Sequence, residues 1–196
     1  YGGYLSRGNL ITIGNPNLKP EESVSFDLGV EQRFLADKLT LGFTWFRIDF
    51  DDLIIYDTAL NKYKNATEAT TEGFETSLNL TPCKWFKLGA AYTYADSEYK
   101  DNVTGDWLQE EYLPQTKISA SATFIPLDGL NATLRVVWQD EKIVPLYDPN
   151  FRTVRWEEPS VVTVDASVSY RFMKHYEVWL RAENLLDKEY SEGGYT

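Results

Sequence analysis

Aromatic and cationic side chains are interspersed along polar stretches of the second half of the chain, and this combination favours binding over catalysis. Such groups can hold an anionic, partly aromatic ligand through ring stacking, cation–π contact and charge-assisted hydrogen bonds. The same side chains can instead brace loops against one another or anchor them at a membrane interface. The candidate ligand-binding residues are Trp107, Tyr112, Tyr147, Arg152, Arg155 and Trp156. Phe151 belongs to the same aromatic and cationic stretches.

Few residues are suited to catalysis or to a resident metal ion. His175 is the single histidine, so neither a histidine cluster nor a Ser-His-Asp triad can form. No nucleophile elbow and no glycine-rich phosphate loop occurs. Asp49, Asp51 and Asp52 lie close together, but they lack the glycine turn and spaced oxygen ligands of a calcium loop, which favours a solvated rim. We therefore expect no catalytic residue, no metal site and no cofactor.

The charge balance and the single cysteine limit the partners and the covalent chemistry. Asp and Glu number 30 against 19 Lys and Arg, which gives a net charge of −11. This charge argues against nucleic acid as a partner, because phosphate contacts need cations. Cys83 has no second cysteine with which to form an internal disulfide, and we interpret it as structural or incidental. No stretch approaches the roughly 18 consecutive apolar residues of a membrane-spanning helix.

The elements that must position the candidate residues are eight runs in which apolar residues occupy every second place. In the first run Val24 and Phe26 lie on one face and Ser25 on the other, because successive side chains of a strand point to opposite faces. In the last run Trp179 interrupts the polar face. The runs are residues 23–34, 39–45, 72–80, 85–94, 117–124, 130–138, 161–172 and 176–186.

The links between these runs alternate between short and long. The short links contain turn-compatible residues and centre on Asp37, Cys83, Asp128 and Lys174. The long links are polar and run from Asp57 to Thr71, from Ala95 to Pro114 and from Asp140 to Pro159. An antiparallel meander places all short turns at one end of the sheet and all long loops at the other. The pattern predicts an all-β chain, an antiparallel meander of about eight long strands that forms part of a transmembrane outer-membrane β-barrel.

A soluble β-sandwich also alternates between its two faces, but three features favour the membrane barrel. The runs reach about ten residues, whereas strands are usually nearer five or six. The polar face carries small and charged residues along its length, as a wet or plugged lumen needs. Aromatic residues gather near the ends of the apolar bands, where interfacial girdles form, namely Trp45, Tyr92, Tyr94, Trp138, Tyr170 and Tyr176.

Two short strings resemble motifs of the TonB-dependent outer-membrane receptors, the family of siderophore and cobalamin receptors. GNPNLKPEES (residues 14–23) leads into the first run, and RAENLLDKEY (residues 181–190) closes the last one. The stretches DFDDLIIYD and TEGFETSLN are also similar to the family. The pair of strings, in this order with eight alternating runs between them, resembles the C-terminal part of that barrel over essentially the whole chain.

Both strings also have a structural interpretation. In the first string the two prolines fix φ and rigidify the entry from a loop into a strand. Asn15 and Asn17 can bond neighbouring backbone groups and define a turn, and Asn184 and Asp187 can do the same in the second string. We therefore expect these motifs to shape the backbone rather than to contact a ligand.

The resemblance implies that residues 1–196 are a C-terminal fragment of a receptor barrel, without its plug, first barrel half and last strand. It implies a receptor in the outer membrane of a Gram-negative bacterium, in contact with outer-membrane lipid. Such a receptor binds and imports a scarce bulky nutrient such as a ferric siderophore or cobalamin, and the TonB coupling protein acts through the missing N-terminal part. A passive porin-like barrel and a soluble β-rich binding module remain as alternatives.

Overall fold

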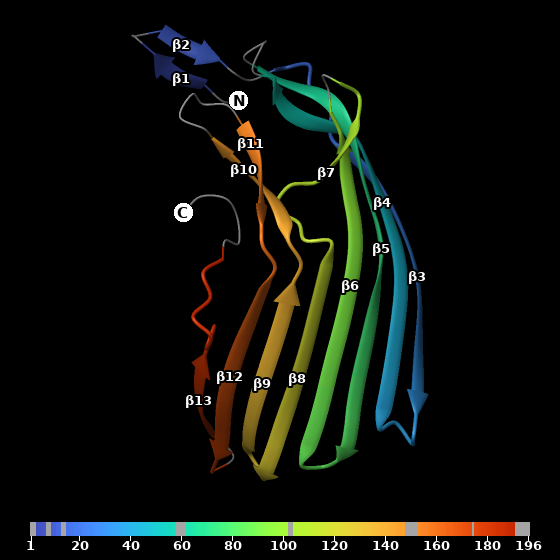
Figure 1. Cartoon of the computed structure of the whole chain (residues 1–196), viewed down its shortest axis with the longest axis vertical. Coiled ribbons are helices and arrows are strands. Elements are labelled where there is room, and N and C mark those ends of the chain that lie inside the picture. The colour runs from blue at the N-terminus through green and yellow to red at the C-terminus, as the bar shows by residue number, and fades with distance from the viewer. Residues whose placement is uncertain are drawn as a thin grey trace. The chain divides into compact units, whose positions relative to one another are not determined.

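The computed structural model describes residues 3–6, 9–12, 15–57, 62–101, 104–147, 153–173 and 175–190, and their regular elements are all β-strands. Among these residues there is no helix with the length and apolarity needed to cross a membrane. Eight long strands follow one another in a single antiparallel sheet, in the order β13-β12-β9-β8-β6-β5-β4-β3 (Figure 1). They are β3 (Glu22–Phe34), β4 (Leu39–Asp57), β5 (Lys62–Cys83), β6 (Phe86–Lys100), β8 (Thr116–Leu127), β9 (Leu130–Gln139), β12 (Val161–Phe172) and β13 (Tyr176–Ala182). The predicted eight-strand meander is confirmed.

Contacts divide the chain into two compact units. Unit 1 comprises Tyr1–Phe26, Arg47–Glu72 and Ser97–Glu110. Unit 2 comprises Asp27–Phe46, Gly73–Asp96 and Glu111–Thr196. The strands β3 to β6 contribute residues to both units.

The short links form tight turns at one end of the strands of unit 2, the lower end in Figure 1. In the first turn Leu35, Ala36 and Asp37 all have positive φ, and the Lys38 N–H donates to the Leu35 carbonyl at 3.3 Å. The third turn uses Gly129 at φ 88°, a conformation that glycine adopts without steric cost. The predicted short links therefore contain turns, but the second turn lies at Lys84 and Trp85 rather than at Cys83, which ends β5, and Lys174 lies outside the described residues.

Parts of the three predicted long loops are β-strands. The predicted boundaries of these loops were therefore wrong. Strand β4 continues to Asp57 and β5 begins at Lys62, so most of the first long link is paired. The other long links contain the end of β6 with β7 (Trp107–Gln109), and a hairpin of β10 (Lys142–Tyr147) and β11 (Thr153–Glu158). A further hairpin, β1 (Gly3–Ser6) with β2 (Asn9–Thr12), precedes the sheet. The two strands of a hairpin satisfy each other's backbone hydrogen bonds. Polar stretches rich in threonine can therefore extend a strand pair even where apolar residues no longer alternate.

The last predicted run is also too long at its C-terminal end. Strand β13 ends at Ala182, and the irregular residues that follow keep one backbone bond to β12, from the Leu185 N–H to the Val164 carbonyl at 2.7 Å. Asn184 takes a left-handed φ of 50°, and its N–H donates to Asp165 Oδ1 at 2.9 Å. A side chain thus replaces the regular ladder partner at this position.

The strand register separates two faces of opposite polarity in unit 2. Leu134 lies opposite Ala122 and Ala166, whereas its neighbour Arg135 lies opposite Ser121 and Asp165. The apolar face remains accessible, with Leu28 66% and Leu180 74% exposed. A sandwich would bury such a face against a second sheet, whereas a membrane barrel presents it to lipid. Trp179, opposite Ser169, interrupts the polar face as predicted and is 71% exposed.

Aromatic side chains of the apolar face form cross-strand stacks in unit 2. The Phe74 ring centroid lies 5.6 Å from that of Tyr92 and 5.8 Å from that of Tyr94. Near the short turns, Phe172 stacks on Tyr170 and on Tyr176. Pairs of this kind stabilise neighbouring strands beyond the burial of their area. Three of the predicted girdle residues, Tyr92, Tyr170 and Tyr176, therefore take part in ring stacks, and Tyr94 makes a tilted ring contact.

Candidate ligand-binding site

The structure distributes the predicted ligand-binding residues over both units. Tyr112, Tyr147, Arg155 and Trp156 belong to unit 2, and Trp107 belongs to unit 1. Tyr147 ends β10 opposite Thr153, but its side chain lies outside the described part. Arg152 and Phe151 also lie outside the described residues, so their predicted role is not addressed by the structure.

Three of these residues come together at the β10–β11 hairpin. The Tyr112 N–H donates to the Ile143 carbonyl at 2.7 Å, and Arg155 Nη1 lies 3.7 Å from Glu111 Oε1. The segment before β8 is thereby held against the hairpin, which is the bracing role considered for Tyr112 and Arg155. Trp156 differs, because it leaves 46% of its surface exposed and so presents a ring on which a ligand can stack.

The base of this hairpin is held by charged residues that are almost fully buried. Lys142 Nζ and Glu158 Oε2 lie 3.2 Å apart, and both side chains are only 11% exposed. Lys142 is the register partner of Glu158, and Val144 two residues further on is 3% exposed. The hairpin therefore leaves the sheet from a packed base.

In unit 1, Trp107 pairs in register with Lys100 and is 44% exposed. A polar hollow of about 590 Å³ lies in the same unit, lined by Asp51, Asp52, Asn65, Thr67, Glu68, Lys100, Asp101 and Gly105. Within the described ranges, no group of three or more His, Cys, Asp or Glu side chains is arranged to hold a metal ion.

Two of the three aspartates weighed as a cation site are engaged in ion pairs. Asp49 pairs with Arg47 at 2.9 Å, and Asp52 pairs with Lys19 at 3.7 Å. Both carboxylates are more than two-fifths exposed. This arrangement supports the interpretation as a solvated rim.

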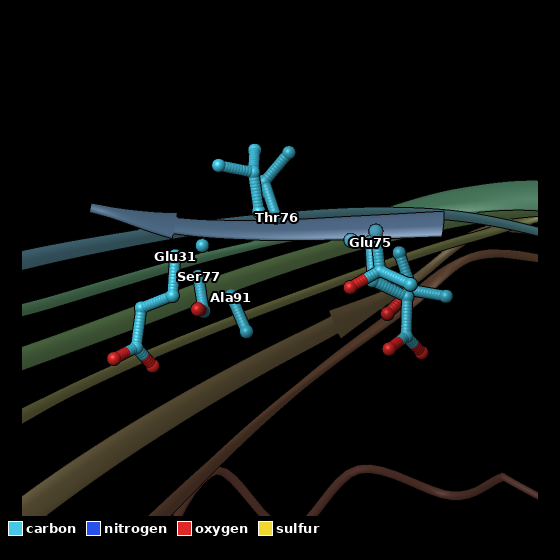
Figure 2. A pocket seen from close by; sticks show the side chains of 10 residues that line it. Glu31, Glu75, Thr76, Ser77 and Ala91 are labelled. Carbon is cyan, nitrogen blue, oxygen red and sulfur yellow. The ribbon is translucent and has the colours of Figure 1, made fainter. Parts of the chain in front are cut away.

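Among the described residues of unit 2, two hollows lie on the polar face. The first has a volume of about 500 Å³ and is lined by β3, β4, β5 and β6. Figure 2 shows Glu31, Glu75, Ser77 and Ala91 on one side of the strands and Thr76 on the other. The hollow depends on glycine, because a Cβ on Gly42 would lie 2.6 Å from Ser77 Oγ. Its charged lining is acidic, since Glu31 and Glu75 contribute carboxylates.

A second hollow on the same face, of about 360 Å³, has a cationic lining. It lies over β8, β9, β12 and β13 and includes Lys117, Arg135, Gln139, Asp165, Arg181, Glu183 and Asn184. Arg181 pairs with Glu183 at 2.5 Å, and Asp165 accepts the Asn184 N–H. In the part of the chain that the structure describes, Lys117 and Arg135 have no ion-pair partner, and both are exposed. Such exposed donors suit an anion with several oxygen acceptors.

Sequence reasoning did not single out this second hollow. Alternation already assigns Arg135, Asp165 and Arg181 to polar-face positions, but it does not say which strands are neighbours or in which register. The usable signal was the presence of long cationic side chains at polar-face positions of several strands.

The turns expected in both sequence motifs are present, although Arg181, Glu183, Asn184 and Tyr190 of the second motif also line the second hollow. The Asn17 N–H donates to Asn15 Oδ1 at 3.0 Å, which closes an Asx turn. In the second motif Asn184 Oδ1 accepts the Lys188 N–H at 3.1 Å, and Asn184 Nδ2 donates to the Lys188 carbonyl at 2.9 Å. Asp187 takes part through its backbone N–H, which donates to the Asn184 carbonyl.

Comparison with known proteins adds three findings to this geometry. The family model described as TonB dependent receptor-like, beta-barrel, matches residues 1–185. The probable TonB-dependent siderophore receptor PiuA of Acinetobacter baumannii is 26% identical over 205 residues, covering 98% of this chain and 27% of that protein. The iron-regulated outer membrane virulence protein of Vibrio cholerae is 28% identical over 211 residues, covering 98% of this chain and 31% of that protein.

A solved structure agrees with these matches. The crystal structure of the siderophore receptor PiuA from Acinetobacter baumannii has a TM-score of 0.68 at 27% identity. That match covers 94% of this chain and 27% of the PiuA chain. The chain thus spans less than a third of the length of these relatives.

Proposed function

The chain belongs to the TonB-dependent receptor-like β-barrel family, and from this premise we propose that it serves in a receptor that imports ferric siderophores across the outer membrane. The family consists of outer-membrane receptors rather than enzymes, and the chain contributes strands to such a barrel in a Gram-negative bacterium. We further propose that residues 1–196 form the C-terminal part of the barrel and that the TonB coupling protein supplies the energy for import.

The observation that carries this proposal is the cationic hollow on the polar face. Lys117 and Arg135 form no ion pair among the described residues, and with Arg181 they outnumber the two carboxylates of the hollow, Asp165 and Glu183, in a chain whose net charge is −11. In a barrel of this family the polar face borders the lumen. An anionic iron chelate with several oxygen acceptors matches these donors in charge and in hydrogen-bonding capacity.

We propose the predicted loop residues as further ligand contacts, each considered within its own unit. Trp156 and Trp107 expose aromatic surface that can stack on the flat groups of a chelate. Tyr112, Tyr147, Arg152 and Arg155 remain proposed contacts, and we expect a smaller direct effect from Arg155 because it already pairs with Glu111. PiuA is named as a siderophore receptor and the Vibrio cholerae relative as an iron-regulated protein, which favours an iron chelate over the cobalamin-type ligand that the sequence motifs also suggested.

Uptake of radiolabelled iron tests this function. A deletion strain that expresses the full-length receptor is supplied with catecholate, hydroxamate and carboxylate iron chelates in turn, with labelled cobalamin as a further arm. We expect uptake of at least one iron chelate, and we expect that uptake to stop when TonB is absent. Uptake that persists without TonB would instead favour a passive porin, and uptake of cobalamin alone would change the ligand class.

Neutral substitutions in the hollow test the role of its charges. We expect Lys117→Gln and Arg135→Gln each to weaken binding of an anionic chelate about tenfold, since a hydrogen bond to a charged group contributes roughly 1.5–3 kcal/mol. Lys87→Gln is the matched control, because Lys87 lies on the same face, opposite Thr123, but outside the hollow. Equal binding by all three variants would remove the hollow from the proposed ligand contacts.

A further inference from the structure

Strand β4 contains a backbone distortion in unit 1 that its own ladder does not explain. Asp52 has a φ of 56°, in the left-handed region that non-glycine residues seldom adopt. Two backbone groups beside it are bound by side chains. The Asp52 carbonyl accepts a hydrogen bond from Asn65 Nδ2 at 2.6 Å, and the Ile54 N–H donates to Glu21 Oε1 at 2.8 Å.

Asn65, in β5, links three segments of unit 1 through one amide group. Besides the Asp52 carbonyl, its Nδ2 donates to the Lys19 carbonyl at 3.0 Å, and its Oδ1 accepts the Lys19 N–H at 2.8 Å. The side chain thus pairs with Lys19 as a peptide group of a neighbouring strand would. An asparagine amide offers two donors and one acceptor oxygen, and all of these are used here.

The segment before β3 completes this arrangement. Asn15 Nδ2 donates to the Tyr63 carbonyl at 3.0 Å, so residues 15–21 contact β5 at two points and β4 at one through hydrogen bonds. The Lys19–Asp52 ion pair is 3.7 Å long, with side chains 73% and 42% exposed, and contributes little at that exposure. Pro16 and Pro20 restrict the segment before it docks, which lowers the entropy lost on docking.

We propose that residues 15–21 form an intramolecular clasp, in which Glu21 and Asn65 are positioning residues that hold the distorted backbone at Asp52. The clasp sets the backbone conformation of the described residues of β4 and β5 beyond that point, 53–57 and 62–64. It also shapes one wall of the polar hollow of unit 1, because Asp52 and Asn65 both line it. This assigns a mechanical role to the NPNLKPE motif, which identifies the family but has no part in the proposed ligand contacts.

Hydrogen exchange in the detergent-solubilised full-length receptor tests the clasp, followed by mass spectrometry of peptides that contain Ile54 and Asn65. We expect Glu21→Ala and Asn65→Ala to accelerate exchange in these peptides about five- to tenfold, because one net hydrogen bond corresponds to about 1 kcal/mol. Glu21→Gln keeps an acceptor oxygen and should stay near the wild-type rate. If Asn65→Ala prevents folding, the two Glu21 variants still decide the question.

Two control variants separate the clasp from general destabilisation. Asn79 lies in the same strand as Asn65, and its side chain makes no hydrogen bond among the described residues. Asn79→Ala should therefore leave the exchange rate of these peptides unchanged. Lys19→Met removes only the exposed ion pair and should also have no effect. The clasp is overturned if the peptides of Glu21→Ala exchange at the wild-type rate. It is also overturned if the exchange rate of Asn65→Ala is the same as that of Asn79→Ala, or the same as that of Lys19→Met. None of these measurements uses a siderophore, so they are independent of the proposed transport function.

Discussion

Unit 1 and unit 2 are both built from antiparallel strands, yet different interactions hold them together. Unit 2 has an apolar face opposite a polar one, and its β10–β11 hairpin rests on the nearly buried Lys142–Glu158 pair. Exposed ion pairs occur in both units, such as Arg171 with Glu177 in unit 2, but the described pairs of unit 1, such as Arg47 with Glu72, all have side chains that are more than two-fifths exposed. The buried polar contacts of unit 1 are hydrogen bonds of hydroxyl groups, such as Thr71 with Ser97 at 3.0 Å.

The difference shows where charge contributes to stability in this chain. Water screens an exposed pair and competes for its hydrogen bonds, so the net gain is small. A nearly buried pair is different, because loss of one partner leaves the other charge without solvation or compensation. The Lys142–Glu158 pair of unit 2 should therefore be sensitive to the loss of a single charge, whereas the exposed pairs of unit 1 should not, and there the buried hydroxyl contacts should matter more.

The largest effect is expected at the base of the β10–β11 hairpin. Glu158→Gln should destabilise the hairpin by about 3–5 kcal/mol, because it leaves the Lys142 ammonium nearly buried without its carboxylate. Hydrogen exchange of β10 and β11 in the full-length receptor measures this cost. A double replacement, Lys142→Met with Glu158→Gln, should cost clearly less than the single one. If Glu158→Gln destabilised the hairpin no more than the loss of an exposed ion pair does, the proposed contrast between buried and exposed pairs would be wrong.

The apolar face of unit 2 should show the next largest effect. Leu134→Arg places a charge on the apolar face, for which we propose contact with lipid, and should cost about 2–4 kcal/mol near the bilayer centre. Ser167→Arg is the matched change on the polar face, opposite Thr133, and should be tolerated much better. Reversible unfolding from lipid vesicles measures both variants. Equal tolerance on the two faces would count against their assignment to lipid and lumen.

Loss of a buried hydroxyl should have an intermediate effect in unit 1. Ser97→Ala leaves Thr71 Oγ1 without the partner that it has at 3.0 Å, and Ser97 itself is only 6% exposed. We expect a loss of about 1 kcal/mol in local stability, measured by exchange of the β5 and β6 amides. Ser119→Ala on β8 serves as a control, because that hydroxyl has no hydrogen bond in the described part.

The smallest effect is expected from the exposed charges of unit 1. Arg47→Met removes the ion pairs with Asp49 and Glu72, which are both solvent-accessible. We expect no resolvable change in the free energy of unfolding at physiological salt. At higher ionic strength the variant and the wild-type protein should also have the same stability. A loss as large as that of Ser97→Ala would show that these exposed pairs act as a network.

Much of the sheet could be predicted because alternation is a local property of the chain. Runs such as residues 161–172 show their two faces without any knowledge of their neighbours, and turn residues such as Asp128 and Gly129 indicate where the chain reverses. Predictions were less accurate where both faces of a strand are polar. The stretch from Lys62 to Thr71 is paired as part of β5, yet nothing in its alternation indicates a strand.

The sequence by itself determined the meander, the polarity of its two faces and the family of the protein, because these depend on residue order and spacing. Only the tertiary structure decided which side chains meet. The register brings Arg135 beside Asp165, and the fold of unit 1 places Asn65 against Lys19, which is 46 residues away. Alternation repeats every two residues and is compatible with many registers, so contacts between distant residues follow only once the strands have paired.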